Sequence, residues 1–148
     1  MSSIEVSVTV PHDKSHAWEY YFNQINGWWS SDFYTSPRTK RFIVDTYIGG
    51  KAYEDFGEGG GLVWGDVIGV DYTNSLHIRG TLYKEYGGPA ITLEKFSFIE
   101  KGETTMVTYT CDFVGGVTES AIRSLQKGWE SILTVSYTHL TLPTTPYV

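Results

Sequence analysis

The stretch that decides the fold is residues 104–133, TTMVTYTCDFVGGVTESAIRSLQKGWESIL. Its first half alternates with the period of a half-buried β-strand, and the inward set comprises Val107, Tyr109, Cys111 and Phe113. Gly115-Gly116 ends this strand, and Thr118 can cap the helix that follows. That helix carries an apolar stripe made of Ala121, Ile122, Leu125, Trp129, Ile132 and Leu133. Since only a sheet is available to cover the stripe, we expect one long helix lying across a sheet.

Upstream of this stretch the sequence is rich in strands and poor in helices. Residues 4–10 alternate as a first strand, and a short helix with a second turn at Trp28 and Trp29 follows. Further strands are predicted at 40–48, 51–56, 62–71, 75–83, 90–100 and 104–113. Short connections make neighbouring strands antiparallel. We therefore predict an α+β fold, with a curved seven-stranded antiparallel sheet around a long C-terminal helix and two short helices after the first strand.

The glycine-rich segment 49–67, GGKAYEDFGEGGGLVWGDV, raises the question of a phosphate-binding loop. Such a loop needs a preceding buried strand and a following helix whose N-terminus attracts the phosphate. Here both flanks have strand patterns, and acidic residues stand where lysine or serine would be needed. We interpret the segment as a hairpin whose glycines supply positive φ angles.

Composition and charge exclude several classes of protein. A net charge of -6 without any local basic stripe argues against nucleic-acid binding. Cys111 is the only cysteine, so an internal disulfide is impossible and a reducing cytoplasm is expected. No segment is apolar and long enough to span a membrane. The 16% of aromatic residues instead indicates a core or pocket walled by rings in a single domain.

Several short motifs, in their order along residues 4–133, resemble one known family. They are Gly27-Trp28-Trp29, Gly49-Gly50, Tyr53-Glu54-Asp55-Phe56-Gly57, Trp64-Gly65-Asp66-Val67, Val70-Asp71, the turn Gly102-Glu103-Thr104-Thr105 and Gly128-Trp129-Glu130-Ser131-Ile132-Leu133. The family is the SRPBCC (START-like) superfamily, and within it the homologues of the C-terminal domain of the activator of heat shock protein 90 ATPase. This resemblance implies a helix-grip fold over residues 4–134 and brings no catalytic motif with it. The proline pair usual after Val-Asp in the family is replaced here by Tyr72-Thr73.

No group of residues in the sequence forms a convincing catalytic or metal site. His12 and His16 are spaced as metal ligands, but no further ligand lies beside them, so solvated residues are the better interpretation. Another polar set, His77, Arg79, Thr81 and Tyr83, shares one strand face that we assign to solvent. Acidic residues near the hairpin, Asp55, Glu58 and Asp66, are expected to be ordinary surface acids, and Cys111 a small buried apolar residue. We therefore predict no catalytic residue, no metal and no cofactor.

Aromatic side chains are the remaining functional signal. A ring with a polar tip suits a wall that holds an apolar ligand and orients one polar group. The predicted ligand-binding residues are Trp28, Trp29, Tyr53, Tyr83, Phe96, Phe98, Tyr109, Leu125 and Trp129. For Trp129, which lies on the helix stripe, a purely structural role is the favoured interpretation.

These observations predict a cytoplasmic protein that binds a small hydrophobic or amphipathic ligand between sheet and helix. One alternative, implied by the family resemblance, is an interaction module that stimulates a chaperone ATPase. A further alternative is an enzyme of the cyclase or dehydratase type, which a buried acid or histidine with a perturbed pKa would favour.

The tail at 135–148, VSYTHLTLPTTPYV, departs from the family pattern. β-Branched residues crowd into it, and Pro143 and Pro146 are incompatible with a helix interior. The string resembles the translated adapter read-through found at the ends of misassembled reading frames. One interpretation is therefore an artefactual tail that replaces the native terminus from near Leu133 or Thr134; the other is a genuine irregular tail. If the tail is artefactual, we expect the helix to span only residues 118–134, a length of about 25 Å.

Overall fold

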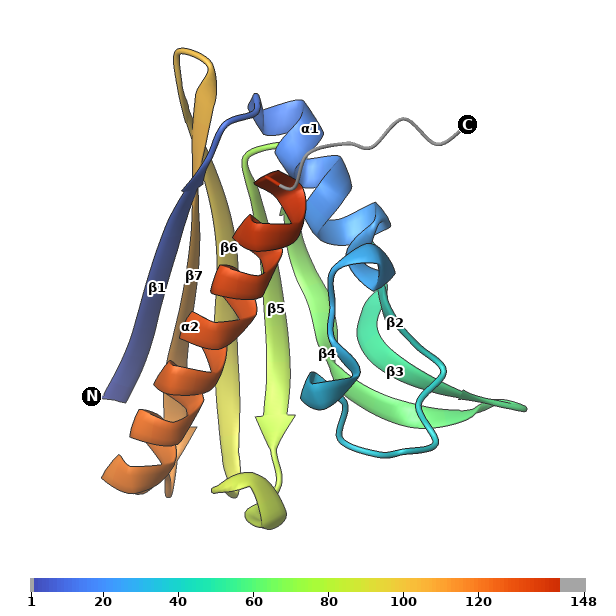
Figure 1. Ribbon diagram of the computed structural model, residues 1–148. Coiled ribbons are helices and arrows are strands. Elements are labelled where there is room, and N and C mark those ends of the chain that lie inside the picture. The colour runs from blue at the N-terminus through green and yellow to red at the C-terminus, as the bar shows by residue number, and fades with distance from the viewer. Residues whose placement is uncertain (1, 142–148) are drawn as a thin grey trace.

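The computed structural model describes residues 2–141 and contains one seven-stranded antiparallel sheet (Figure 1). Its strands are β1 (Ser2–Val10), β2 (Arg41–Val44), β3 (Lys51–Gly57), β4 (Gly60–Asp71), β5 (Ser75–Leu82), β6 (Ala90–Lys101) and β7 (Thr104–Gly115). They are ordered β1-β7-β6-β5-β4-β3-β2, so β1 and β2 form the two edges. This arrangement confirms the predicted fold class, although β2 ends at Val44 rather than near residue 48.

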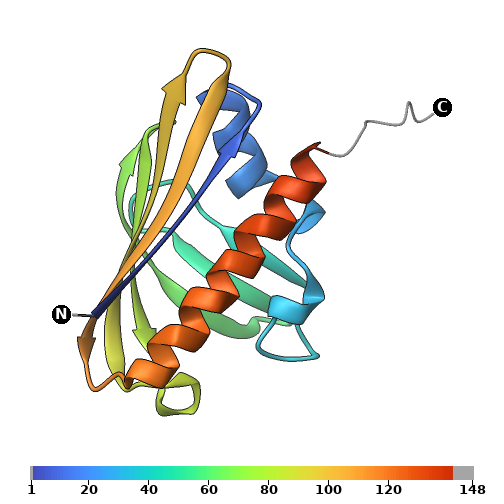
Figure 2. The same cartoon turned by 60° about the vertical axis from the view of Figure 1, so that its left-hand side comes forward.

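The long helix α2 (Glu119–Thr141) lies across the concave side of the curled sheet (Figures 1 and 2). Thr118 precedes it, and its hydroxyl accepts a hydrogen bond from the Ala121 backbone N–H at 3.2 Å, as expected of a cap. Trp129, Ile132 and Leu133 of the predicted stripe are buried against the sheet. Among the described residues, no helix is long and apolar enough to cross a membrane.

Between β1 and β2 the chain forms the predicted short helices. α1 (Lys14–Trp18) is capped by the side chain of Asp13, which accepts from the His16 N–H at 2.9 Å. A π-helical turn (Glu19–Asn23) and two 3-10 turns (Ile25–Gly27 and Ser31–Phe33) follow. Their rings close one end of the core. Trp18, for example, meets Phe22 edge to face at a centroid distance of 4.8 Å.

The glycine-rich segment is a hairpin, as predicted. Gly57, Glu58 and Gly59 turn with positive φ angles of 87°, 58° and 78°, and Gly57 pairs with Gly60. Gly49, one turn earlier, also has a positive φ of 86°. Strand flanks on both sides leave no helix N-terminus that could hold a phosphate.

The inner face of β7 follows the predicted alternation, because all four residues of its predicted inward set are buried, namely Val107, Tyr109, Cys111 and Phe113. On the neighbouring strand β6, Phe96 and Phe98 are buried in the same way. In β4 the alternation is interrupted, because its pairing shifts register next to Ala52 on one side and between Val67 and Gly69 on the other. These bulges explain why alternation alone assigns no clear inner face to β4.

The predicted end of the long helix near residue 134 is wrong, because α2 continues to Thr141. Ser136 lies one turn past Leu133 on the same side and is fully buried. Its hydroxyl bonds the Tyr21 hydroxyl at 2.8 Å, and its carbonyl accepts from the Tyr20 hydroxyl at 2.8 Å. These contacts offset the low helix propensity of the Val and Thr residues. Pro143 and Pro146 lie outside the described residues, and the interpretation of 135–148 as a foreign tail stays a prediction.

Candidate functional site

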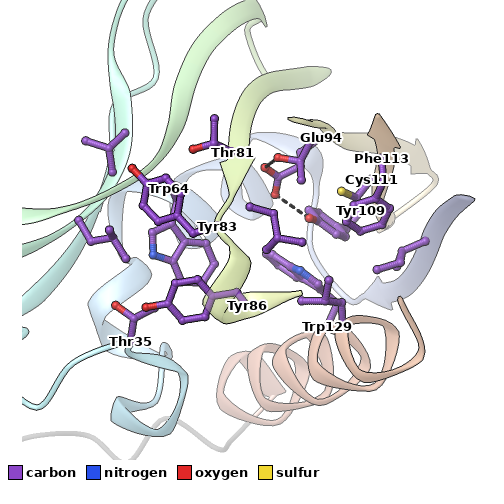
Figure 3. Close-up of a pocket in the computed structure, with 16 residues that line it drawn as sticks. Thr35, Trp64, Thr81, Tyr83, Tyr86, Glu94, Tyr109, Cys111, Phe113 and Trp129 are labelled. Carbon is purple, nitrogen blue, oxygen red and sulfur yellow. Dashed lines mark hydrogen bonds between the residues drawn. The ribbon is translucent and has the colours of Figure 1, made fainter. Parts of the chain in front are cut away.

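A cavity of about 170 Å³ lies between the sheet and α2 (Figure 3). Strands β4 to β7 supply most of its walls, and α2 closes it with Leu125 and Trp129. Most of the lining is apolar or aromatic, including Ile4, Leu82 and Phe113. Its size is close to that of an engineered apolar cavity of about 150 Å³ that binds benzene. There is therefore room for a ligand built around a single ring.

One carboxyl group stands in this wall. Glu94 on β6 accepts a hydrogen bond from the Tyr109 hydroxyl at 2.6 Å and another from the Thr92 hydroxyl at 3.0 Å. Figure 3 shows the Glu94–Tyr109 bond beside the ring of Trp129. Trp129 stacks on Tyr109 with ring centroids 3.7 Å apart, so the helix holds Tyr109 in place. Glu94, in contrast, keeps some accessible surface, because it faces the cavity.

Desolvation changes the acidity of Glu94, Tyr109 and Cys111. Burial raises the pKa of Glu94, although the hydrogen bonds from Tyr109 and Thr92 oppose that rise. Burial, reinforced by the nearby Glu94 charge, raises the pKa of Tyr109 well above its usual value. The same two causes raise the pKa of Cys111 to about 12, so this thiol is a buried apolar group, as predicted.

The raised pKa of Glu94 makes stability depend on pH. Between the unfolded-state pKa of about 4.3 and the higher folded-state pKa, the native protein holds a proton that the unfolded chain has released. Stability therefore falls as pH rises through this window. We expect Glu94→Gln to lose this dependence. The free energy of unfolding of the variant, measured relative to that of the parent, should therefore increase as pH rises through the window and become constant above it.

Urea melts of both proteins at a series of pH values test this expectation. Glu103, exposed in the turn between β6 and β7, is the matched control, and Glu103→Gln should follow the parent closely at every pH. A constant difference between Glu94→Gln and the parent across the whole series would contradict the expectation.

The mouth of the cavity is formed by Thr35, Trp64, Tyr83 and Tyr86 (Figure 3). Tyr83 and Tyr86 are about half exposed, at 53% and 45%, so the cavity can be reached from solvent at this side. The positions of Thr35 and Trp64 depend on a second buried acid. Fully buried Glu54 accepts from the Thr35 N–H at 2.9 Å and from the Trp64 indole N–H at 2.7 Å.

A second cavity of about 30 Å³ adjoins the first, and the two share Trp64, Glu94 and Trp129 as lining residues. It is large enough for one water molecule. Trp29 also lines it, and the buried indole N–H of Trp29 has no hydrogen-bond partner in the described part of the chain.

The structure divides the nine predicted ligand-binding residues into three groups. Lining the main cavity are Tyr83, Tyr109, Leu125 and Trp129. Lining the small cavity are Trp28, Trp29 and Phe96, with Trp129 again. Two residues line neither cavity. Tyr53 lies on β3 with the opposite parity to buried Ala52 and Glu54, and Phe98 is enclosed by Trp18, Tyr21 and Phe22.

The polar groups that the sequence singled out lie mostly outside the cavity. His16 is exposed, and its ring Nδ1 lies 2.8 Å from an Asp13 carboxyl oxygen. Hydrogen bonds lower the pKa of Asp55, from the Gly57 N–H first and Arg41 second, and a bond from Lys51 lowers that of Asp66. Both are ionised surface acids, as expected. In the described range 2–141, no cluster of His, Cys, Asp or Glu could hold a metal ion.

Sequence analysis missed Glu94 and Glu54. A signal existed for both, since Glu94 shares the parity of buried Phe96 and Phe98, and Glu54 shares that of buried Ala52. A carboxyl group on the inner face of a strand is unusual, so an acid with the parity of buried neighbours is a sign of a functional or structural role.

Similarity to solved structures agrees with this geometry. A protein from Mesorhizobium loti, MLL2253, superimposes with a TM-score of 0.73 at 13% identity, over 97% of this chain and 99% of its own. DynU16, a protein of the dynemicin biosynthetic locus, gives 0.71 at 17% identity over 96% of this chain. The match covers 48% of DynU16, so this chain spans about half its length. The Aha1 dimer from Colwellia psychrerythraea gives 0.70 at 13% identity, over 98% and 100% of the two chains.

At these identities the likeness establishes the fold alone. The fold is the helix-grip architecture that the sequence resemblance implied, with a curled antiparallel sheet and a C-terminal helix. The sequence matches no family model and no curated protein.

Proposed function

We propose that the protein binds a small hydrophobic or amphipathic ligand in the cavity between sheet and α2. The observation that carries the proposal is an apolar, ring-lined cavity of about 170 Å³ with a single, partly buried carboxyl group in its wall. Sites of this kind combine apolar walls with a few polar groups that fix the orientation of the ligand. A cytoplasmic location, expected from the cysteine content, is part of this proposal.

Native mass spectrometry and a thermal-shift screen against a library of small lipophilic compounds test the binding function. Co-purifying small molecules, or compounds that raise the melting temperature in proportion to the logarithm of their concentration, support it. If no compound of about 6 to 12 non-hydrogen atoms stabilises the protein at millimolar concentration, the binding function is wrong.

Filling the cavity should abolish binding without unfolding the protein. Leu125 lines the cavity from α2, and its partly exposed position can accommodate a larger side chain. We expect Leu125→Trp to weaken binding of any screening hit at least about tenfold, because the indole occupies the space of the ligand. Ser124→Trp, on the exposed side of the same helix, is the control and should bind as the parent does. Equal affinities for both variants in calorimetric titrations would place the ligand elsewhere.

The second candidate function is an enzyme with acid/base chemistry, and the Glu94–Tyr109 pair is the observation that favours it. Burial raises the pKa of Glu94, and a carboxyl group with a raised pKa is a candidate general acid or base. A screen of small ketones in D₂O, followed by NMR, tests it. Exchange at the carbon next to the carbonyl should exceed the buffer rate in the parent and fall to it in Glu94→Gln.

The chaperone-related alternative rests on the family resemblance and on the shared fold of the Aha1 dimer. An ATPase assay with the cognate chaperone separates it from ligand binding. Stimulation that survives Leu125→Trp would favour the interaction module.

A further inference from the structure

The lining of the main cavity contains an acidic side chain but no basic one. Among residues 2–141, Glu94 is the only carboxyl group in the lining, and no Lys, Arg or His lines it. Nothing in this wall could therefore pair with the negative charge of a ligand. The chain as a whole is also acidic, with a net charge of -6, which attracts cations and repels anions.

Glu94 is held by hydroxyl groups rather than by a cation. Its two oxygens accept from Tyr109 and Thr92, and it belongs to none of the ion pairs in the described chain. The hydroxyl donors orient the carboxyl group and leave each oxygen with further acceptor capacity toward the cavity. Buried carboxylates are normally paired with a positive group. Here the fold supplies the orientation of the acid but not its counter-charge.

Aromatic rings surround the same space. Tyr109 and Trp129 line the cavity close to Glu94, Trp64 lines the same cavity, and Tyr83 and Tyr86 stand at its mouth (Figure 3). The face of an aromatic ring attracts a cation, most strongly for Trp and where water is excluded. A positively charged group beside Glu94 thus meets favourable partners on several sides.

We propose that the ligand is a small organic amine, whose ammonium group binds the Glu94 carboxylate and whose apolar body fills the ring-lined cavity. This inference rests on the proposed binding function and specifies the charge of the ligand. The ammonium group donates hydrogen bonds to the carboxylate oxygens that face the cavity, and Tyr109 and Thr92 keep those oxygens in position. The cavity volume matches a body of about one ring.

Three probes of nearly equal size test the inference, namely 2-phenylethylamine, 2-phenylethanol and phenylacetate. Their affinities are measured by calorimetry on the intact chain at mildly alkaline pH, where Glu94 is most ionised. We expect the amine to bind at least about tenfold more tightly than the alcohol, and phenylacetate to bind most weakly. Glu94→Gln should weaken the amine roughly 10- to 100-fold and the alcohol less than about threefold.

Two further measurements keep the result interpretable. Glu103→Gln, in the exposed turn between β6 and β7, should bind all three probes as the parent does. Binding of 2-phenylethanol to Glu94→Gln verifies that this variant is folded. A preference for the amine that survives Glu94→Gln would overturn the inference, because another group would then recognise the charge.

The pH dependence of the amine affinity provides an independent readout. The titratable side chains facing Glu94 are Tyr109 and Cys111 of β7, while β5 presents Ile78 and Gly80 and α2 presents Trp129. Burial raises the pKa values of Tyr109 and Cys111, so both stay neutral near pH 7. Amine affinity should therefore rise with pH as Glu94 ionises, and Glu94→Gln should remove this rise.

The outcomes separate the inference from the proposed function. If the alcohol binds and the amine is not preferred, the cavity is a binding site but the inference is wrong. If neither these probes nor the lipophilic library binds, both are wrong.

Discussion

Replacing Trp129 by Ala is expected to lower the free energy of unfolding by about 3 to 5 kcal/mol, the usual cost of truncating a large buried ring. The side chain is 8% exposed and joins α2 to three parts of the core. It stacks on Tyr109 with centroids 3.7 Å apart and meets Phe96 and Trp29 edge to face at 5.9 and 6.2 Å. Since Trp129 lines both cavities, its loss also merges them into a larger void that the neighbouring rings cannot fill.

Urea melts of the parent and the variant measure this loss. Trp129→Phe is the graded control, because a smaller ring keeps part of the stacking on Tyr109 and should lose clearly less stability. A difference of less than about 1 kcal/mol for Trp129→Ala would show that this residue does not anchor the helix on the sheet. The sequence favoured a structural role for Trp129, and a loss of about 3 to 5 kcal/mol on Trp129→Ala would support that role.

The architecture could be predicted from the sequence because it depends on local periodicity. The alternation in residues 104–113 predicts a strand, and the apolar stripe that follows predicts a helix. Neither prediction requires knowing which element the strand or the helix packs against. The hairpin at Gly57–Gly60 likewise follows from glycines that must turn the chain. Both features were confirmed because each is decided by residues close together in the chain.

The chemistry of the site depends on register, which periodicity does not provide. Glu94 meets Tyr109 because β6 pairs with β7 so that Phe96 lies opposite Tyr109 and Glu94 lies opposite Cys111. A pairing moved by two residues would keep every apolar residue inside but would move Tyr109 away from the acid. Glu54 is similar, since its partners Thr35 and Trp64 come from a loop and from the next strand.

The end of α2 was mispredicted because it, too, depends on contacts between residues far apart in the chain. Propensity argued against a helix in residues 135–141, but the contacts that stabilise it come from Tyr20 and Tyr21, more than a hundred residues earlier. Tertiary contacts of this kind commonly override weak local preferences. If residues 135–148 are foreign to the family, Ser136 nevertheless occupies a position where its hydroxyl and carbonyl groups are both bonded.

Two deletions separate the structural part of this tail from the rest. Removing residues 139–148 should leave stability nearly unchanged, within about 1 kcal/mol, because His139 and Thr141 are exposed and Leu140 is only partly buried.

Removing residues 135–148 should cost about 2 to 4 kcal/mol, because it uncovers the fully buried Tyr21 and takes away the partners of two tyrosine hydroxyls. Ser136→Ala in the full chain isolates the hydroxyl contribution and should cost about 1 to 2 kcal/mol. Denaturant melts of the three variants measure the difference. Equal stabilities for the two deletions would show that α2 contributes nothing beyond Thr134, whereas a large loss on removing 139–148 would show that the last residues are part of the fold.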